Sequence, residues 1–236
     1  MNDLARIWIA LAAFVAGAGS LWGGQQLAHA TSGMPGSAAS ARDYVLAHPE
    51  MISEVIDTLR QRQSGAVIAA NRSAILDPYA GAWAGNPKGD VTIVEYFDYN
   101  CGYCRASLPT IQKLLADDPK LRIVFRELPI LSPQSGDAAK LSLAAAAQGK
   151  FRAFHLAMYA GGPITPDSMN KAVQVAGVDP SRTAPGAEQE IERNLTIARD
   201  LGLSGTPSWV IGNRAVSGAL PLDTFKKAIA EARAAH

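Results

Sequence analysis

The sequence predicts an α/β fold in which a block of helices interrupts a small sheet. Three observations support this prediction. Apolar residues alternate in the manner of strands over residues 91–99 and again over 121–127, and a helical pattern follows the first of these strands. Residues 134–203 carry helical patterns throughout, and a hairpin pattern and a last helix come after them. Such a sequence of elements packs helices on a sheet around one core.

The only two cysteines, Cys101 and Cys104, stand between the first strand and the helix that follows it. A cysteine at the start of a helix faces free backbone N–H groups, which favour a thiolate. Cys101 is therefore the expected nucleophile of disulfide exchange, and Cys104 is near enough to close a short ring with it. Gly102 and Tyr103, between them, are expected to tune the redox poise and to shape the substrate-facing surface.

Other interpretations of the cysteine pair are weaker. A structural zinc site needs four ligands, and none of the four histidines forms a second ligand pair with a neighbour. A structural disulfide across so short a loop would stabilise the fold little. Two buried free thiols are disfavoured by the flanking strand and helix. We therefore predict a redox disulfide, Cys101–Cys104, with no metal ligands and no cofactor.

From Trp83 to the carboxyl terminus the chain resembles the DsbA family of thiol–disulfide oxidoreductases, which have a thioredoxin-like fold with an inserted α-helical subdomain. The motifs that carry the resemblance are Glu95, the Cys101-Gly102-Tyr103-Cys104 box and Thr206-Pro207. The resemblance divides this part of the chain into a thioredoxin-like domain and a helical insertion. Their ranges are 82–133 with 204–236 for the domain, and 134–203 for the insertion.

The resemblance also implies a role for each motif residue. Pro207 would lie in a cis-proline loop against the sulfurs, and the Thr206 backbone would pair with a bound substrate strand. Glu95 would be a buried acid below the active site, and its place among apolar residues of one strand face supports this. Burial would raise its pKa and allow proton exchange with Cys104. The alternative for Glu95 is a hydrogen-bonded structural acid.

This chain differs from the strong oxidases of the family at two places. The strong oxidases have Pro-His between the cysteines and Val before the cis-proline. This chain has Gly102-Tyr103 and Thr206 there, as isomerase and reductase members do. The resemblance therefore implies that this protein forms or rearranges disulfides in secreted proteins. It leaves both activities, oxidase and isomerase, as alternatives. The implied partners are unfolded or misoxidised secreted clients and a membrane redox partner, which is either an oxidase or a reductase.

The amino-terminal region predicts export. Residues 1–30 match a signal peptide, because an apolar run over 7–22 follows Arg6 and Ala28-His29-Ala30 has the pattern of a cleavage site, with cleavage after Ala30. The alternative is an uncleaved membrane anchor, although the run is shorter than the roughly 20 residues that a span requires. Either way the protein would face an oxidising compartment such as the periplasm, where a dithiol couple can act.

The next segments predict a linker at residues 31–40, which is rich in Ser, Gly, Ala and Pro, and a helical extension at 41–81 with a break at Gly65. The extension carries an apolar stripe that needs a partner. The stripe consists of Met51, Ile52, Val55, Ile56 and Leu59. Either the main domain or another copy of the chain would cover it. Residues 43–50 resemble the amino-terminal segment of ScsC-like members of the DsbA family, some of which oligomerise through this region, so a homo-oligomer through residues 41–64 is one expectation.

Composition limits the other classes of function. A net charge of +1 and the lack of a basic stripe argue against nucleic-acid binding. An exchange enzyme that acts on many unfolded clients needs no electrostatic steering. The alternative function is an envelope copper-binding or metal-tolerance protein that uses the Cys101 and Cys104 thiolates, since thiolates select Cu(I). However, no Met- or His-rich tract accompanies the two cysteines.

Overall fold

The structure, a computed structural model, describes residues 38–235. The predicted signal peptide and most of the predicted linker lie outside this range. The chain divides into two compact units between Ile56 and Asp57. Within residues 38–235, no helix combines the length and the apolar character that a membrane span requires.

Helices account for the amino-terminal segment. α2 (Ala38–Ala47) begins within the predicted linker, and α3 (Glu50–Ala70) follows Pro49, whose ring removes a backbone donor and separates the two helices. The break predicted at Gly65 is not found. A glycine costs about 1 kcal/mol in a helix, and the burial of Ile68 on the next turn offsets this cost. The chain breaks after α3 instead, before the short helix α4 (Arg72–Leu76).

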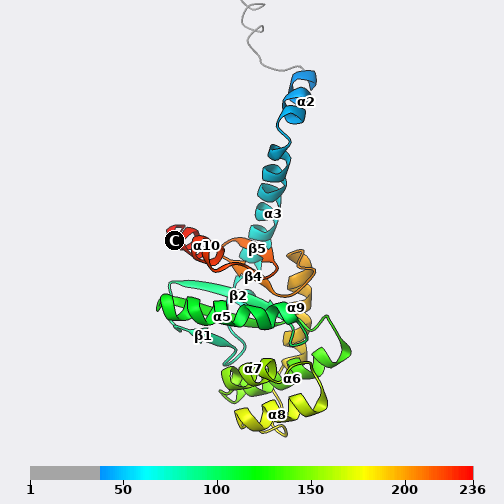
Figure 1. Cartoon of the computed structure of the whole chain (residues 1–236), viewed down its shortest axis with the longest axis vertical. Coiled ribbons are helices and arrows are strands. Elements are labelled where there is room, and N and C mark those ends of the chain that lie inside the picture. The colour runs from blue at the N-terminus through cyan, green and yellow to red at the C-terminus, as the bar shows by residue number, and fades with distance from the viewer. Residues whose placement is uncertain (1–37, 236) are drawn as a thin grey trace, which may run out of the picture. The chain divides into compact units, whose positions relative to one another are not determined.

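A five-stranded mixed sheet forms the centre of the second unit (Figure 1). Its strands lie in the order β1-β3-β2-β4-β5. Its strands are β1 (Trp83–Gly85), β2 (Val91–Phe97), β3 (Leu121–Glu127), β4 (Ser208–Ile211) and β5 (Arg214–Ser217). β2 and β3 pair in parallel, and the other neighbours are antiparallel. Since β2 and β3 are buried on nearly every residue, helices must cover both faces of the sheet.

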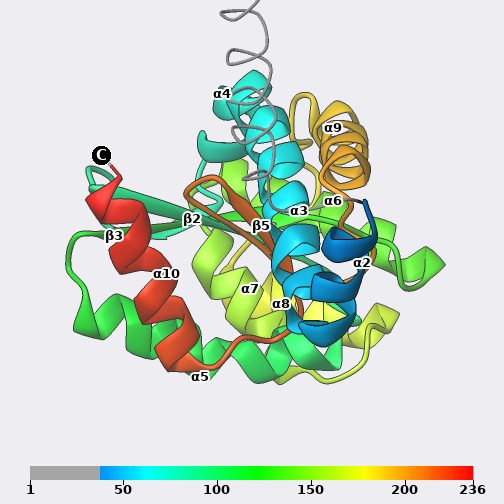
Figure 2. The same cartoon turned by 90° about the horizontal axis from the view of Figure 1, so that it is seen from above.

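Six further helices complete the second unit. They are α5 (Gly102–Asp117), α6 (Pro133–Ala147), α7 (Phe151–Ala160), α8 (Pro166–Ala176), α9 (Ala187–Asp200) and α10 (Leu222–Ala234). α5, α7 and α10 pack on the face that carries Ile93 and Phe97, and Figure 2 shows α5 and α10 together on this side. α4 and α9 pack on the face that carries Val94 and Tyr96. The structure confirms the predicted α/β fold with a helical insertion between two parts of one sheet.

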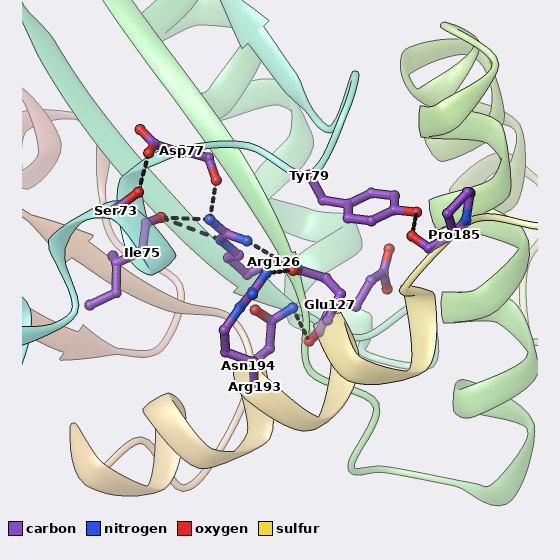
Figure 3. A network of polar contacts seen from close by, with 10 residues as sticks. Ser73, Ile75, Asp77, Tyr79, Arg126, Glu127, Pro185, Arg193 and Asn194 are labelled. Atoms are coloured by element: carbon purple, nitrogen blue, oxygen red, sulfur yellow. Dashed lines mark hydrogen bonds and ion pairs between the residues drawn. The ribbon is translucent and has the colours of Figure 1, made fainter.

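A buried ion pair joins the inserted helices to the sheet (Figure 3). Arg126 of β3 pairs with Glu190 of α9, and both side chains are 1% exposed. Arg126 also donates to the backbone carbonyls of Ile75 and Asp77 at the end of α4. Desolvation lowers the pKa of Arg126 to about 10, so the guanidinium stays charged at neutral pH. Arg126 therefore connects α4, β3 and α9.

Candidate active site

Cys101 is the amino-terminal cap of α5. Its sulfur accepts a hydrogen bond from the backbone N–H of Cys104 at 3.4 Å, and its thiol donates to the carbonyl oxygen of Thr206 at 3.1 Å. Both cysteines are free thiols and are buried. The sulfur of Cys101 therefore lies where the unpaired N–H groups of a helix terminus concentrate partial positive charge.

A loop from the far end of the sequence completes this arrangement. The Thr206–Pro207 peptide bond is cis. The carbonyl of Pro207 accepts the backbone N–H of Gly218 at 2.7 Å, which holds the loop beside the end of β5. The structure thus brings the Cys101–Cys104 pair together with Thr206 and Pro207, although Cys101 and Thr206 are 105 residues apart along the chain.

Glu95 lies on β2 beneath the cysteines and is 1% exposed. Its Oε2 atom has no hydrogen-bond partner among the described residues. Burial, followed by the charge on Cys101, raises the pKa of Glu95 well above its usual range. Burial also raises the pKa of Cys104, and the nearby Glu95 carboxylate raises it further. Glu95 and Cys104 are therefore two buried groups near each other, and the ionised form of Glu95 disfavours the thiolate of Cys104.

The two residues between the cysteines lie at the surface. The side chain of Tyr103 is 71% exposed. A Cβ atom added at Gly102 would meet no heavy atom within 4 Å, so no steric constraint requires glycine there. Arg105, one turn further along α5, donates to the carbonyl of Gly162 at 2.6 Å and ties the helix to the loop before α8. A substrate approaching Cys101 would therefore meet Gly102 and Tyr103.

Asp98 is a part of the site that sequence reasoning missed. Its carboxylate accepts four hydrogen bonds, from the backbone N–H groups of Asn100, Ile130 and Leu131 and from the hydroxyl of Ser135. Its backbone carbonyl accepts the N–H of Cys101 at 3.0 Å. Asp98 thus fixes the loop after β3 against the start of α5. The only available signal was a polar residue near the cysteines, since three of its four partners, Ile130, Leu131 and Ser135, lie 32 to 37 residues away.

A second set of buried polar residues, also missed, lies behind Cys104. The hydroxyl of Tyr99 is 2.9 Å from Ser142 Oγ and 3.1 Å from His155 Nδ1. The hydroxyl of Tyr159 donates to the carbonyl of Asp98 at 3.2 Å. The helical pattern over residues 134–203 gave His155 and Tyr159 no role in the site, because such a pattern does not show which strand a residue faces.

The large surface groove and a possible metal site can both be compared with this dithiol site. A groove of about 930 Å³ lies between α3, the β4–β5 hairpin and α10, but it reaches the start of β2, at Val91 and Thr92, whereas Cys101 follows the end of that strand. Within residues 38–235, no group of three or more His, Cys, Asp or Glu side chains is arranged to hold a metal ion. Cys101 and Cys104 would therefore provide two ligands and no third.

The fold and the dithiol at the start of α5 define a thioredoxin-like thiol–disulfide oxidoreductase. The sequence profile of the DSBA-like thioredoxin domain matches residues 92–230. The chain therefore belongs to the DSBA-like thioredoxin family, as the sequence motifs predicted.

Solved structures agree with this assignment. A thioredoxin-like oxidoreductase from Silicibacter pomeroyi DSS-3 is 38% identical and covers 70% of this chain and 99% of its own, with a TM-score of 0.66. The thiol-disulfide exchange protein alpha-DsbA2 from Wolbachia pipientis is 31% identical, and the match covers 73% of this chain and 97% of that protein, with a TM-score of 0.66. A linker-deletion variant of Proteus mirabilis ScsC matches over 86% of this chain and 100% of its own, with a TM-score of 0.71. Because the identity is 23%, this match shows the shared fold alone.

One curated relative is described as an antiporter and not as an oxidoreductase. The Na(+)/H(+) antiporter NhaA 3 of Salinispora tropica is 28% identical over 185 residues, which are 72% of this chain. The chain spans only 28% of the length of that relative.

Proposed function

We propose that this chain is an exported enzyme that forms or rearranges disulfides in secreted proteins through the Cys101–Cys104 couple. The observation that carries the proposal is the position of the Cys101 sulfur, which caps α5 and contacts the carbonyl of Thr206 beside cis-Pro207. This geometry places the Cys101 sulfur at a helix terminus beside the exposed residues Gly102 and Tyr103, while Cys104 is still more deeply buried, at 1% exposed against 4% for Cys101. Glu95 would act as the proton donor and acceptor for Cys104.

In the oxidising direction, a client thiolate attacks Cys101 Sγ of the enzyme disulfide. The Cys101–Cys104 bond breaks, and Cys104 leaves with the electron pair and takes a proton from Glu95. A second client thiolate then attacks the client sulfur of the mixed disulfide, so that the client disulfide forms and Cys101 leaves as a thiolate. Two electrons pass to the enzyme. In isomerisation, the reduced Cys101 attacks a client disulfide, and a different client thiolate later releases it.

Substitution of Glu95 by Gln tests its role in proton transfer. We expect disulfide exchange to slow by about tenfold or more, since general acid–base catalysis typically contributes at least that factor. The pKa of folded Glu95 lies above its unfolded value of 4.5, so the wild-type protein loses stability as pH rises above that value. The Gln variant should therefore be more stable than wild type at neutral pH and equally stable near pH 4. Exchange kinetics and urea unfolding at both pH values measure this. Unchanged kinetics would remove Glu95 from the mechanism.

The proposed location and partners follow from the chemistry. A dithiol enzyme that oxidises or isomerises clients operates in an oxidising compartment, and the predicted signal peptide at residues 1–30 would deliver it there. A periplasmic thioredoxin-like protein from Salmonella enterica serovar Typhimurium, 30% identical over 69% of this chain, supports the periplasm. A membrane redox partner, either an oxidase or a reductase, would restore the couple after each cycle.

We further propose that the chain is an isomerase that forms a homo-oligomer through residues 41–64. Large apolar side chains of α2 and α3 are exposed in the single chain. They are Tyr44, Val45, Leu46, Ile52, Val55, Ile56 and Leu59, with exposed fractions of 37–62%. Soluble proteins rarely expose a continuous apolar stripe unless a partner covers it. Ile52, Val55, Ile56 and Leu59 have the spacing with which one helix packs on another.

A client assay on two variants tests the isomerase proposal. The full chain should have a solution mass above that of a monomer and should reactivate a ribonuclease with scrambled disulfides. The double variant Ile52→Lys/Leu59→Lys should be monomeric and lose this reactivation, but keep its exchange rate with glutathione. Asp57→Lys, which places the same charge on an exposed polar position of α3, is the control. A monomeric wild-type chain that only oxidises reduced clients would be an oxidase instead.

A further inference from the structure

Glu127, the last residue of β3, is a buried acid for which the exchange mechanism above gives no role. It is 2% exposed, and its Oε1 atom has no hydrogen-bond partner among the described residues. The adjacent Arg126 cannot neutralise it, because successive strand residues face opposite sides of a sheet and Arg126 is engaged by Glu190. Burial raises the pKa of Glu127 well above its usual range, while a hydrogen bond from Ser142 lowers it and the charge on Asp98 raises it.

The position of Glu127 relates it to the active site. In the parallel pairing of β2 and β3, Glu127 lies opposite Phe97, and Glu95 lies opposite Phe125. The two buried acids are therefore on adjacent strands, two positions apart, and face the same apolar layer. Tyr99 is sensitive to both, because the charges on Glu127 and on Glu95 each add to the effect of burial in raising its pKa.

A chain of hydrogen bonds leads from Glu127 toward the opposite side of this layer. Ser142 contacts Glu127, the hydroxyl of Tyr99 is 2.9 Å from Ser142 Oγ, and His155 Nδ1 is 3.1 Å from that hydroxyl. His155 is neutral at physiological pH, because burial lowers its pKa to about 3. His155 also lines a cavity of about 30 Å³ between α5 and α7.

Building on the proposed exchange function, we propose that Glu127 is a second proton-holding group of the dithiol site. It is a positioning residue that acts through Glu95 and Cys104, and Ser142, Tyr99 and His155 connect it to the cavity between α5 and α7. When Cys104 leaves the disulfide and takes the proton of Glu95, a negative charge remains in a buried pocket. A protonated Glu127 permits this charge, whereas an ionised Glu127 opposes it by like-charge repulsion.

The titratable groups around Glu127 come from three elements. Asp98, Tyr99 and Tyr159 interact with Glu127 directly. Glu95, Cys104 and His155 lie beyond them and interact with these two tyrosines. α6 contributes Ser142, which does not titrate, and Asn194 of α9 donates to the backbone carbonyl of Glu127 at 3.2 Å. Since none of these groups is a cation, ionisation of Glu127 is not compensated within the pocket.

The test is the pH profile of disulfide exchange with glutathione, measured on the full chain. Wild type should slow at alkaline pH as Glu127 and Glu95 ionise. Glu127→Gln, in which Glu95 alone still titrates, should slow only at a higher pH and should exchange about tenfold faster than wild type where wild type has already slowed. Tyr99→Phe removes the hydroxyl between Ser142 and His155, and it should change the pH at which the exchange rate falls. Glu188→Gln is the control, because it removes a carboxylate at an exposed position of α9 and should slow at the same pH as wild type.

The outcomes are separable. If Glu127→Gln slows at the same pH as wild type, or if wild type does not slow at alkaline pH, the role of Glu127 is wrong while the exchange function stands. If Glu127→Gln does not fold, a Tyr99→Phe profile identical to that of wild type overturns the role in the same way. If wild type shows no exchange with glutathione at any pH, the proposed function itself fails.

Discussion

Substitution of Cys101 by Ser should abolish disulfide exchange, with a loss of about 10³-fold or more, because the other thiol at the start of α5, Cys104, is 1% exposed and burial raises its pKa. Cys104→Ser should behave differently. Cys101 would still attack a client disulfide, but no second thiol would release the mixed disulfide. The Cys104→Ser variant should therefore accumulate a covalent complex with a disulfide-containing peptide, visible by mass spectrometry without reducing agent, whereas Cys101→Ser should form none.

Folding must be kept apart from chemistry in this experiment. Cys101 and Cys104 are both buried, and serine is close to cysteine in size, so both variants should retain the circular dichroism spectrum of wild type. If Cys101→Ser traps the peptide and Cys104→Ser does not, the order of the two thiols is reversed. That result would contradict the assignment of Cys101 as the nucleophile, which rests on its position as the cap of α5.

Substitution of Arg126 by Met should destabilise the protein by about 3–5 kcal/mol, the usual effect of removing one partner from a buried ion pair. The loss has two sources. Glu190 would keep a buried charge without its main partner, and the carbonyls of Ile75 and Asp77 would lose their donor. Because these contacts connect α4, β3 and α9 (Figure 3), urea unfolding should show a lower midpoint for the whole second unit.

Two further variants separate charge from packing. Arg126→Met/Glu190→Met removes both charges and should recover a large part of the lost stability, since apolar pairs often replace buried ion pairs without cost. Arg193→Ala removes the other cation that pairs with Glu190, but its side chain is 51% exposed, so its loss should cost about 1 kcal/mol or less. A cost below about 1 kcal/mol for Arg126→Met would show that the ion pair does not stabilise the fold.

The features predicted correctly from the sequence are those with local patterns. Strand alternation before Cys101 and helical spacing after Cys104 place the dithiol at a strand–helix junction, and the structure has β2 and α5 there. The alternation also predicted the burial of Glu95, because its neighbours on the same strand face are apolar. The Thr206-Pro207 loop required a family resemblance, since no local pattern relates it to Cys101.

The features that were missed depend on contacts between distant residues. Asp98 is a single polar residue in the sequence, and only the fold brings the loop at Ile130 and Leu131 to its carboxylate. Likewise, Arg126 resembles an ordinary exposed strand residue until α9 covers it with Glu190. The continuity of α3 through Gly65 also depends on packing, which outweighs the weak helix propensity of one glycine.

The most direct test of the central claim is the reduction potential of the Cys101–Cys104 couple, measured by equilibration with glutathione. The proposed isomerase requires a reversible two-electron couple that is clearly more reducing than the value of about −120 mV typical of the strong oxidase DsbA. A reversible couple near that value would instead indicate an oxidase of the same family. Absence of any reversible couple would contradict the exchange function, because the buried pair of thiols would then have no redox role.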